Sequence, residues 1–296
     1  KRSELMSKSQ ITKIQALWIV ALVIIITIGL TYWFQSEINE LQIKVNGLQT
    51  EVDTLREEVQ AFRMLEVSKE IRNTIEQDIQ KHVTIGQMAA MLPQVQSGIW
   101  CNMKDTLVLY ERQLITKSFM WFCYPNGTYY TTLQGYMYNK SLTDRSYFPI
   151  VMSGNVSIGT TVYSKTTGEA VHITAIPVFN GSNVVGILGI STPLAEWSKS
   201  ITTRLNINYP NLFFVLSKNG QYQMHSQTEM ILVANPITGE GMNTTIPYIS
   251  LKNFVKEAFE NKEGTGIYEY DGVTKVCSYT TMTNTQWMVF YAEKPN

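Results

Sequence analysis

The residue types that could support catalysis or bind a metal are few and widely spaced. Histidine occurs three times, at His82, His172 and His225. None of the three has a cysteine, an aspartate or a second histidine at the spacing of metal ligands. The sequence also has no nucleophile elbow, no glycine-rich loop that would cradle a phosphate, and no carboxylate pair in a catalytic setting. We therefore expect no catalytic residue, no metal site and no cofactor, and we predict that the chain is not an enzyme.

The cysteines and the glycosylation sequons allow modifications without demonstrating them. Cys101 and Cys123 could form a disulfide in an oxidising compartment, which would leave Cys277 unpaired; the alternative is three buried free thiols. In a chain this rich in Asn, Ser and Thr, several Asn-x-Ser/Thr sequons arise by chance. The five sequons begin at Asn126, Asn139, Asn155, Asn180 and Asn243.

The composition excludes some classes of partner. The 296 residues contain 24 Lys+Arg and 24 Asp+Glu, so the formal net charge is zero and nothing indicates binding to nucleic acid. The length is sufficient for two modest domains. Charged residues make up 16% of the chain, against about 25% in soluble proteins. Part of this deficit comes from one apolar segment.

That segment, Ala16–Phe34 (ALWIVALVIIITIGLTYWF), contains no charged residue. As a helix it would be roughly 28 Å long, close to the hydrocarbon thickness of a bilayer. Trp18 lies near one end, and Tyr32 and Trp33 lie near the other, as in the aromatic belts of membrane spans. A buried core helix would be shorter and not apolar on every side, and a signal peptide would end at a cleavage site with small residues. We predict a transmembrane helix at residues 16–34.

The charges that flank this segment predict its orientation. Basic residues precede the span, namely Lys1, Arg2, Lys8 and Lys13, and acidic residues follow it, namely Glu37 and Glu40. The positive-inside rule then places a tail of residues 1–15 in the cytoplasm and residues from 36 onward outside. No second apolar stretch of this length exists in the sequence, so we predict a single-pass protein of the cell membrane.

A long stem helix is predicted at residues 36–88. Its apolar residues recur at alternating steps of three and four: Ile38, Leu41, Val45, Leu48, Val52, Leu55, Val59 and Phe62. β-branched residues at heptad position a with leucine at d favour a parallel two-stranded coiled coil, so we predict a homodimer up to about residue 62. A single amphipathic helix packed on its own domain is the alternative. After Phe62 the apolar stripe drifts through Val67, Ile71, Ile75 and Ile79, which predicts packing on the chain's own domain until Gly86 and Pro93 mark the helix end.

The remaining sequence predicts strands joined by tight turns in two similar sets. The first set is a hairpin around Pro125-Asn126-Gly127, a helical stretch at 145–152, and three strands at 160–164, 170–179 and 184–190. The second set repeats this order, with strands at 212–216 and 221–225, a helix at 250–260, and strands at 266–270, 274–281 and 286–292. We predict an α+β chain in which two tandem PAS-like antiparallel sheets follow the long helix.

The order of these segments resembles the double Cache domain, the extracytoplasmic sensor module of bacterial and archaeal chemoreceptors and sensor kinases. The resemblance covers residues 16 to 293. Four stretches carry it: Asp144–Phe148, Ser164–Glu169, Ala175–Ser191 and Tyr268–Trp287. The resemblance implies a membrane-distal module at 89–203 and a membrane-proximal module at 204–296, with small polar metabolites bound in the distal one.

Ligand-facing positions are carried over from the family one by one. They are Arg145, Tyr147 and Phe148 from the helical insertion, Tyr163 and Lys165 from the strand and turn that follow, and Ser191 from the last strand. The planar guanidinium of Arg145 can hold a carboxylate through two charge-assisted hydrogen bonds. An exposed pair with Asp144 or a bond to backbone carbonyls is its structural alternative.

The sequence departs from the family members that bind α-amino acids. Those members have a Trp-Tyr pair where this chain has Tyr147 and Phe148, an aspartate for the ligand ammonium where it has Lys165, and often an aspartate where it has Ser191. A lysine repels an ammonium group and attracts a carboxylate. We therefore expect a carboxylate, including a dicarboxylate, rather than an α-amino acid.

The sequence is compatible with two different kinds of function. The first is a membrane-anchored sensor that binds a small carboxylate and signals as a dimer through the stem helix. Its difficulty is that only about fifteen residues are expected on the cytoplasmic side, so the signal would pass to a partner or to further sequence of a longer receptor. The second is a structural cell-surface protein that reuses the fold and assembles laterally or into a filament.

Overall fold

The computed structural model describes residues 2–243 and 245–295, with side chains for Lys13 and from Gln15 onward. Lys1 and the side chains of Arg2 and Lys8, which contribute to the predicted orientation, lie outside the described part, as does Thr244 of the last sequon. The chain divides into two units, residues 1–60 and 61–296.

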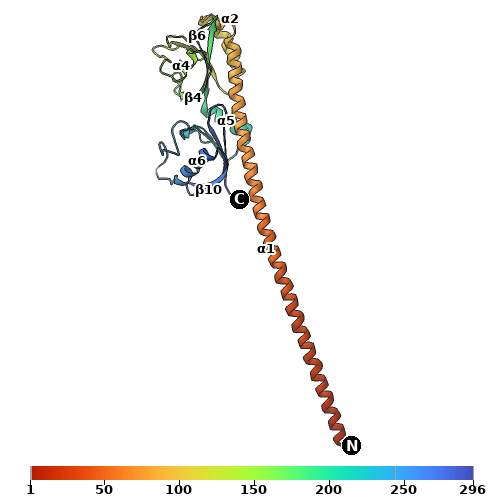
Figure 1. The fold of residues 1–296 in the computed structure, drawn as a ribbon. Helices are drawn as coiled ribbons and strands as arrows, with labels where there is room; N and C mark the ends of the chain where they lie inside the picture. Colours follow the sequence, from red (N-terminus) through yellow and green to blue (C-terminus); the bar gives the residue numbers. More distant parts are fainter. Residues whose placement is uncertain (1, 244, 296) are drawn as a thin grey trace. The chain divides into compact units, whose positions relative to one another are not determined.

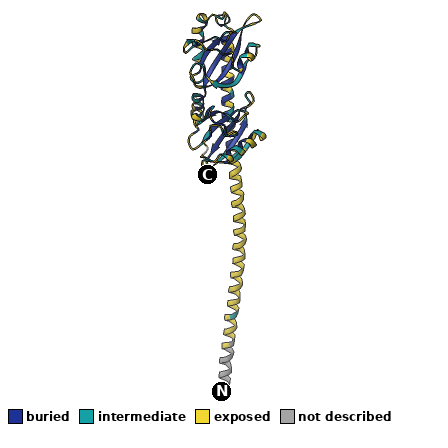
Figure 2. Ribbon diagram, turned by 90° about the vertical axis from the view of Figure 1, so that its left-hand side faces the viewer, coloured by how far each residue is buried: buried dark blue, intermediate teal, exposed yellow. Residues whose placement is uncertain are grey.

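One helix, α1 (Arg2–Ala90), occupies the N-terminal third of the chain. From Gln15 onward it contains, among the described residues, the one helical stretch that is long and apolar enough to cross a membrane, judged by length and composition. Between residues 15 and 59 every described side chain is exposed except that of Ala21, which is half-buried. Figure 2 shows this exposure as the continuous yellow part of the helix.

Short helices and strands make up the rest of the chain (Figure 1). The helices are α2 (Pro93–Gln96), α3 (Trp100–Glu111), α4 (Tyr147–Met152), α5 (Leu194–Arg204), the 3-10 turn η1 (Thr228–Met230) and α6 (Ile249–Asn261). The strands of the first sheet are β1 (Phe119–Cys123), β2 (Tyr129–Thr131), β3 (Gly135–Tyr136), β4 (Ser157–Tyr163), β5 (Ala170–Asn180) and β6 (Asn183–Pro193). Those of the second sheet are β7 (Leu212–Leu216), β8 (Tyr222–His225), β9 (Glu263–Tyr270), β10 (Val273–Thr281) and β11 (Met288–Glu293).

Both sheets are antiparallel, as predicted, and their strand orders are alike. The first sheet has the order β3-β2-β1-β6-β5-β4 and the second β8-β7-β11-β10-β9. In each, the hairpin strands lie on one side and the last strand of the set lies in the interior, beside the first. The first sheet has one strand more than expected, because Gly135 and Tyr136 pair with Thr131 and Tyr130.

The central strands of each sheet are buried on both faces, because helices cover one side and loops with a helix cover the other. In β1 the side chains alternate: Met120 and Phe122 pack with Ile85 of α1 and Leu107 of α3, whereas Trp121 packs with Tyr147 of α4. Successive strand residues point to opposite faces, so a strand covered on both sides reads as one apolar run, FMWFC. Figure 2 shows the strands as the buried part of both sheets.

The second half of α1 supplies much of the core. Ile71, Ile75 and Ile79 are buried, and they pack in one cluster with Trp197 of α5 and Phe213 of β7. Near its end, Gly86 lies so close to β5 that an added Cβ would lie 2.1 Å from Cδ1 of Ile176. The prediction that the helix packs on its own domain after Phe62 is confirmed.

Two longer helices were not predicted, nor were the short helix α2 and the turn η1. We expected strands and turns after about residue 98, but α3 occupies Trp100–Glu111 and α5 occupies Leu194–Arg204. The predicted helical stretch at 145–152 is also shorter, because α4 begins at Tyr147. Arg145 therefore lies in the loop before the helix.

The Cys101–Cys123 disulfide that the sequence allows is not formed in the structure. Cys101, Cys123 and Cys277 are free thiols, and Cys101 is exposed whereas the other two are buried. Burial raises the pKa of the Cys123 thiol to about 12. The alternative of free thiols holds, except that only two of the three are buried.

Strand β4 contacts the second sheet. Thr161 donates a hydrogen bond from its hydroxyl to Oε1 of Gln223 in β8 at 2.5 Å. Gly159 lies where β4 shifts register against β5, at a φ of +78°, and its N–H donates to Nε2 of His172 at 3.1 Å. The His172 ring in turn lies between Trp197 and Trp287, with ring centroids 5.4 and 5.6 Å away.

The three histidines predict how stability depends on pH. Burial lowers the pKa of His82 to about 4, of His172 to about 3 and of His225 to about 4. The unfolded chain, with histidine pKa near 6.5, then binds more protons than the folded chain between about pH 6.5 and pH 4, so acidification favours unfolding. We expect each histidine to remove about 1.4 kcal/mol of unfolding free energy per pH unit in that window.

Urea unfolding at a series of pH values would measure this loss. His172→Phe is expected to reduce the slope between pH 6.5 and pH 4, whatever its effect on stability at pH 8. A parent protein whose unfolding free energy is constant from pH 6.5 to pH 4.5 would contradict the prediction.

Candidate ligand-binding site

The helical insertion and the first sheet enclose a small pocket on the face opposite α1. Its volume is about 20 Å3, which is room for about one water molecule. Most of its side chains come from β1, β4, β5 and β6 and from the loops around α4. They are Trp121, Tyr129, Leu142, Arg145, Tyr147, Val162, Ser164, Lys165, Thr166, Ile173 and Ser191.

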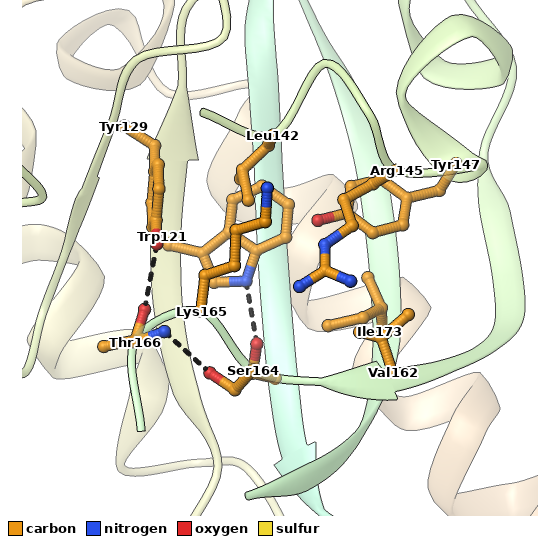
Figure 3. A pocket seen from close by; sticks show the side chains of 11 residues that line it. Trp121, Tyr129, Leu142, Arg145, Tyr147, Val162, Ser164, Lys165, Thr166 and Ile173 are labelled. Carbon is orange, nitrogen blue, oxygen red and sulfur yellow. Dashed lines mark hydrogen bonds between the residues drawn. The ribbon is translucent and has the colours of Figure 1, made fainter. Parts of the chain in front are cut away.

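Arg145 is the cation that this pocket holds without a carboxylate partner among the described residues. Figure 3 shows its guanidinium directed into the space that the lining side chains enclose. Nη2 donates to the backbone carbonyl of Tyr163 at 2.8 Å. Nε is buried and has no hydrogen-bond partner in the described part of the chain. Because an unpaired buried donor is costly, the arrangement leaves one guanidinium edge available to an acceptor.

Lys165 lines the same pocket but its charge is already neutralised. Its ammonium lies 2.7 Å from each carboxylate oxygen of Asp144 and donates to the carbonyl of Ser141 at 2.7 Å. The hydrogen bond from Lys165 lowers the pKa of the Asp144 carboxyl below its usual value. Lys140 donates to the Lys165 carbonyl. These contacts connect the loop before α4 to the turn after β4.

Aromatic side chains form the wall behind Arg145. The rings of Trp121 and Tyr147 lie 5.8 Å apart, and Nε1 of Trp121 donates to the Ser191 hydroxyl at 3.0 Å. Burial raises the pKa of Tyr147 and of Tyr129, so both phenols stay protonated and can donate hydrogen bonds. The Tyr129 hydroxyl lies 3.5 Å from that of Thr166.

Four of the six predicted ligand-facing residues meet in this pocket: Arg145, Tyr147, Lys165 and Ser191. The other two lie elsewhere. Tyr163 is half exposed, at 51%, and contributes its carbonyl rather than its ring. Phe148 is packed against the core cluster beside the pocket. Sequence reasoning missed Trp121, Tyr129, Ser164 and Thr166, although the last two belong to the Ser164–Glu169 stretch that carries the family resemblance.

The other chemistry-bearing residues lie outside this pocket. Among the described residues, no group of three or more His, Cys, Asp or Glu side chains could hold a metal ion. His82, His172 and His225 are buried, and Nδ1 of His225 accepts from the N–H of Gln227 at 2.8 Å. The asparagines of all five sequons are exposed.

Comparison with known proteins identifies what this arrangement is similar to. A family model described as a Cache domain matches residues 51–295. A comparison with curated proteins found no match.

Several solved structures share the fold. The sensory domain of the Campylobacter jejuni chemoreceptor Tlp3 with isoleucine bound is 11% identical, with a TM-score of 0.55, over 80% of this chain and 93% of that chain. The ligand-binding domain of Mlp24 with asparagine is 17% identical, with a TM-score of 0.57, over 78% and 90%. An extracellular ligand binding receptor from Desulfohalobium retbaense is 14% identical, with a TM-score of 0.60, over 78% of this chain and 40% of that one.

Gly189 provides a test of how the pocket wall is built. Gly189 of β6 pairs with Trp121 of β1, and an added Cβ would lie 2.0 Å from the indole ring. We expect Gly189→Ala to displace Trp121, break its bond to Ser191 and cost about 1–3 kcal/mol, the range for overpacking a core. Chemical unfolding and tryptophan fluorescence would measure both effects.

Gly47 offers a control, because an added Cβ there meets nothing within 4 Å. Gly47→Ala, a change in the interior of α1, is expected to stabilise that helix by up to about 1 kcal/mol rather than destabilise the protein, and to leave the fluorescence of the sheets unchanged. Equal stability of Gly189→Ala and the parent would show that Trp121 is not held where the structure places it.

Proposed function

Because the chain belongs to the Cache domain family, we propose that it is a membrane-anchored extracytoplasmic sensor that binds a small carboxylate and signals as a dimer. The observation that carries the ligand class is the buried Nε of Arg145, which has no partner and lies in the pocket. A carboxylate placed against Nε and Nη2 would accept two charge-assisted hydrogen bonds.

The charges around the pocket favour a ligand without an ammonium group. The Asp144 carboxylate is paired with Lys165, so the charges of these two residues offset each other. Arg145 is then the uncompensated charge, which favours a monoanion over a zwitterion or a dicarboxylate. The relatives crystallised with isoleucine or asparagine hold amino acids; this chain would accept the carboxylate without offering a carboxylate for the ammonium.

Binding would require the pocket to open. A volume of about 20 Å3 holds about one water, so a ligand must separate the loop before α4 from the turn after β4. The ion pair between Lys165 and Asp144 and the bond from Arg145 to the Tyr163 carbonyl cross this boundary. A pocket of this small volume is also what the second candidate, a structural surface or filament protein, would have.

The domain arrangement that we propose follows the sequence. Residues 1–15 would be cytoplasmic, 16–34 would span the membrane, and 36–88 would form the stem. Residues 89–203 would be the membrane-distal module and 204–296 the membrane-proximal one. The exposed apolar stretch of α1 supports the span, and the pocket lies in the distal module.

Dimerisation through the stem is supported by its unburied apolar side chains. The heptad residues between Ile38 and Phe62 are 41–66% exposed in the single chain. An apolar seam of this length on a solvent-facing helix is stable in water only when a partner covers it. The same helix continues into the sheets, so a dimeric stem would connect the sensing module to the membrane.

A first test concerns the ligand. We expect a thermal-shift screen of organic acids, amino acids and amines to find a stabilising monocarboxylate. Arg145→Ala should then lose about 2–5 kcal/mol of binding free energy by calorimetry, the range for removing one partner of a buried charge pair. Arg145→Lys should recover only part of it, because an ammonium lacks the planar fork.

Arg112, an exposed residue at the end of α3, is the matched control, and Arg112→Ala should bind like the parent. If Arg145→Ala binds the carboxylate as tightly as the parent, the assignment of Arg145 is wrong. If no carboxylate stabilises the protein at millimolar concentration, the structural role is favoured instead.

A second test concerns the stem. Replacing Leu48 and Leu55 with serine is expected to convert the full chain in detergent from dimer to monomer, because both lie in the predicted seam. Ile43→Ser is the control: Ile43 is 71% exposed but lies off the a and d positions. Sedimentation would measure the oligomeric state. The heptad interpretation is wrong if the parent is monomeric, or if Ile43→Ser reduces dimerisation as much as the change of Leu48 and Leu55 does.

A further inference from the structure

A second groove lies between α6 and the edge of the second sheet. Its volume is about 230 Å3, against about 20 Å3 at Arg145. Its lining combines hydroxyl, amide and carboxylate groups of α6 and β9 with two aromatic rings. The residues are Ser250, Asn253, Phe254, Glu257, Thr265, Gly266, Ile267 and Tyr279.

Strand β9 presents free backbone groups to this groove. It is an edge strand of the second sheet and pairs with β10 alone, without a break in register. The N–H of Glu269 donates to the Ser250 hydroxyl of α6 at 2.9 Å, so it points away from β10. In an antiparallel strand the direction of the backbone groups alternates with period two. The N–H and C=O of Ile267 and Thr265 therefore point to the same side, into the groove.

The helix flanks these backbone groups with polar side chains. Ser250 lies at Glu269, and Glu257 lies seven residues further along α6, about 10 Å at 1.5 Å per residue. The same distance along β9 is about three residues at 3.3 Å each. Glu257 thus lies near Thr265 and Gly266, as the groove lining requires, with Asn253 between it and Ser250.

Glu257 gives the groove a negative charge. It is the charged residue among those that line it, and it has no ion-pair or hydrogen-bond partner in the part of the chain that the structure describes. The nearby Glu263 differs, because it is paired with Lys69. The unpaired negative charge of Glu257 would therefore attract a cationic group to the Thr265 end of the groove.

The floor of the groove is apolar. Phe254 and Tyr279 meet edge to face, with ring centroids 5.7 Å apart. Gly266 keeps this contact close, since an added Cβ would lie 2.9 Å from Cε2 of Phe254. Ile267 is 65% exposed beside it. The groove can therefore take a small apolar side chain between backbone bonds on one side and Asn253 on the other.

From these features we propose that the groove binds a short extended peptide with a free N-terminal ammonium. The peptide adds about three residues to the edge of β9 through the backbone groups of Thr265 and Ile267, which is recognition by strand addition. Its ammonium meets the Glu257 carboxylate. Ser250 limits the length, because it already occupies the edge at Glu269.

The experiment uses the full chain in detergent and two tripeptides of sequence Ala-Val-Ala. Both have an amidated C-terminus, so neither offers a carboxylate to Arg145; one has a free N-terminus and the other is acetylated. We expect calorimetry to find saturable binding of the free amine, and about tenfold weaker binding of the acetylated peptide, because the latter cannot form the charge-assisted bond.

Two variants test the two halves of the site. Glu257→Gln should make both peptides bind equally weakly, whereas Glu260→Gln, a change on the same helix outside the groove, should leave the tenfold preference intact. Ile267→Pro removes one outward N–H without taking a bond from the β9–β10 ladder, and it should abolish binding of both peptides. Arg145→Ala should leave peptide binding unchanged, which separates this site from the carboxylate pocket.

Equal affinity of the parent for the two peptides would overturn the proposal, and so would unchanged selectivity in Glu257→Gln or the absence of saturable binding. A second copy of the chain is the other occupant that an open edge could take. If Ile267→Pro reduced self-association while the stem residues were unchanged, the edge of β9 would be a contact between two copies of the chain. The proposal of a peptide site would then be rejected.

Discussion

The contact on which both sheets depend is the packing of the second half of α1 against them. Ile71, Ile75 and Ile79 form one face of the helix and are buried with Trp197 and Phe213. Further along, Ile85 and Ala89 join the core of the first sheet. A sheet must cover its apolar face with another layer, and here a single helix supplies that layer twice. The polar contacts follow the same helix: Asp78, buried on α1, accepts from Nε1 of Trp197 at 2.8 Å and from Arg204 at 2.7 Å, and so fixes α5 between the sheets.

The fold was predictable where local sequence and tertiary packing agree. The stripe from Val67 to Ile79 has helical spacing, and the turns at Pro125–Gly127 and Lys218–Gly220 carry the residues that tight turns need. The helices α3 and α5 were missed for a physical reason. The segment LAEWSKSITTR of α5 is rich in Ser and Thr, which are not strong helix formers. It is helical because Leu194, Trp197 and Ile201 are buried against other elements, and single-sequence reasoning cannot see those elements.

The sequence was sufficient to predict that Arg145 lies at the site, but it was not sufficient to predict the side chains that form the pocket walls. Arg145 follows from the family motif, but the pairing of Lys165 with Asp144 depends on how the turn after β4 folds back. The Tyr163 ring does not line the pocket, because its neighbour Val162 does and successive side chains of a strand point to opposite faces. Trp121 was missed because it reaches the pocket from a strand about twenty positions before Arg145, through pairing with β6 that no local pattern reveals.

The irregularity in β4 has a consequence for how this chain can diverge. The carbonyl of Tyr163 in this strand accepts a hydrogen bond from Arg145. About 13 Å or less away along the same strand, Gly159 donates to His172 and Thr161 donates to Gln223 of the second sheet. Few residues separate the two groups of contacts, and none of them lies in a flexible loop. A substitution in β4 that changes the shape of the pocket therefore also changes the contacts between the two sheets. Ligand preference is freer to change through the loop before α4, because Asp144 and Arg145 bond there to Lys165 and Tyr163 and, among the described residues, not to the second sheet.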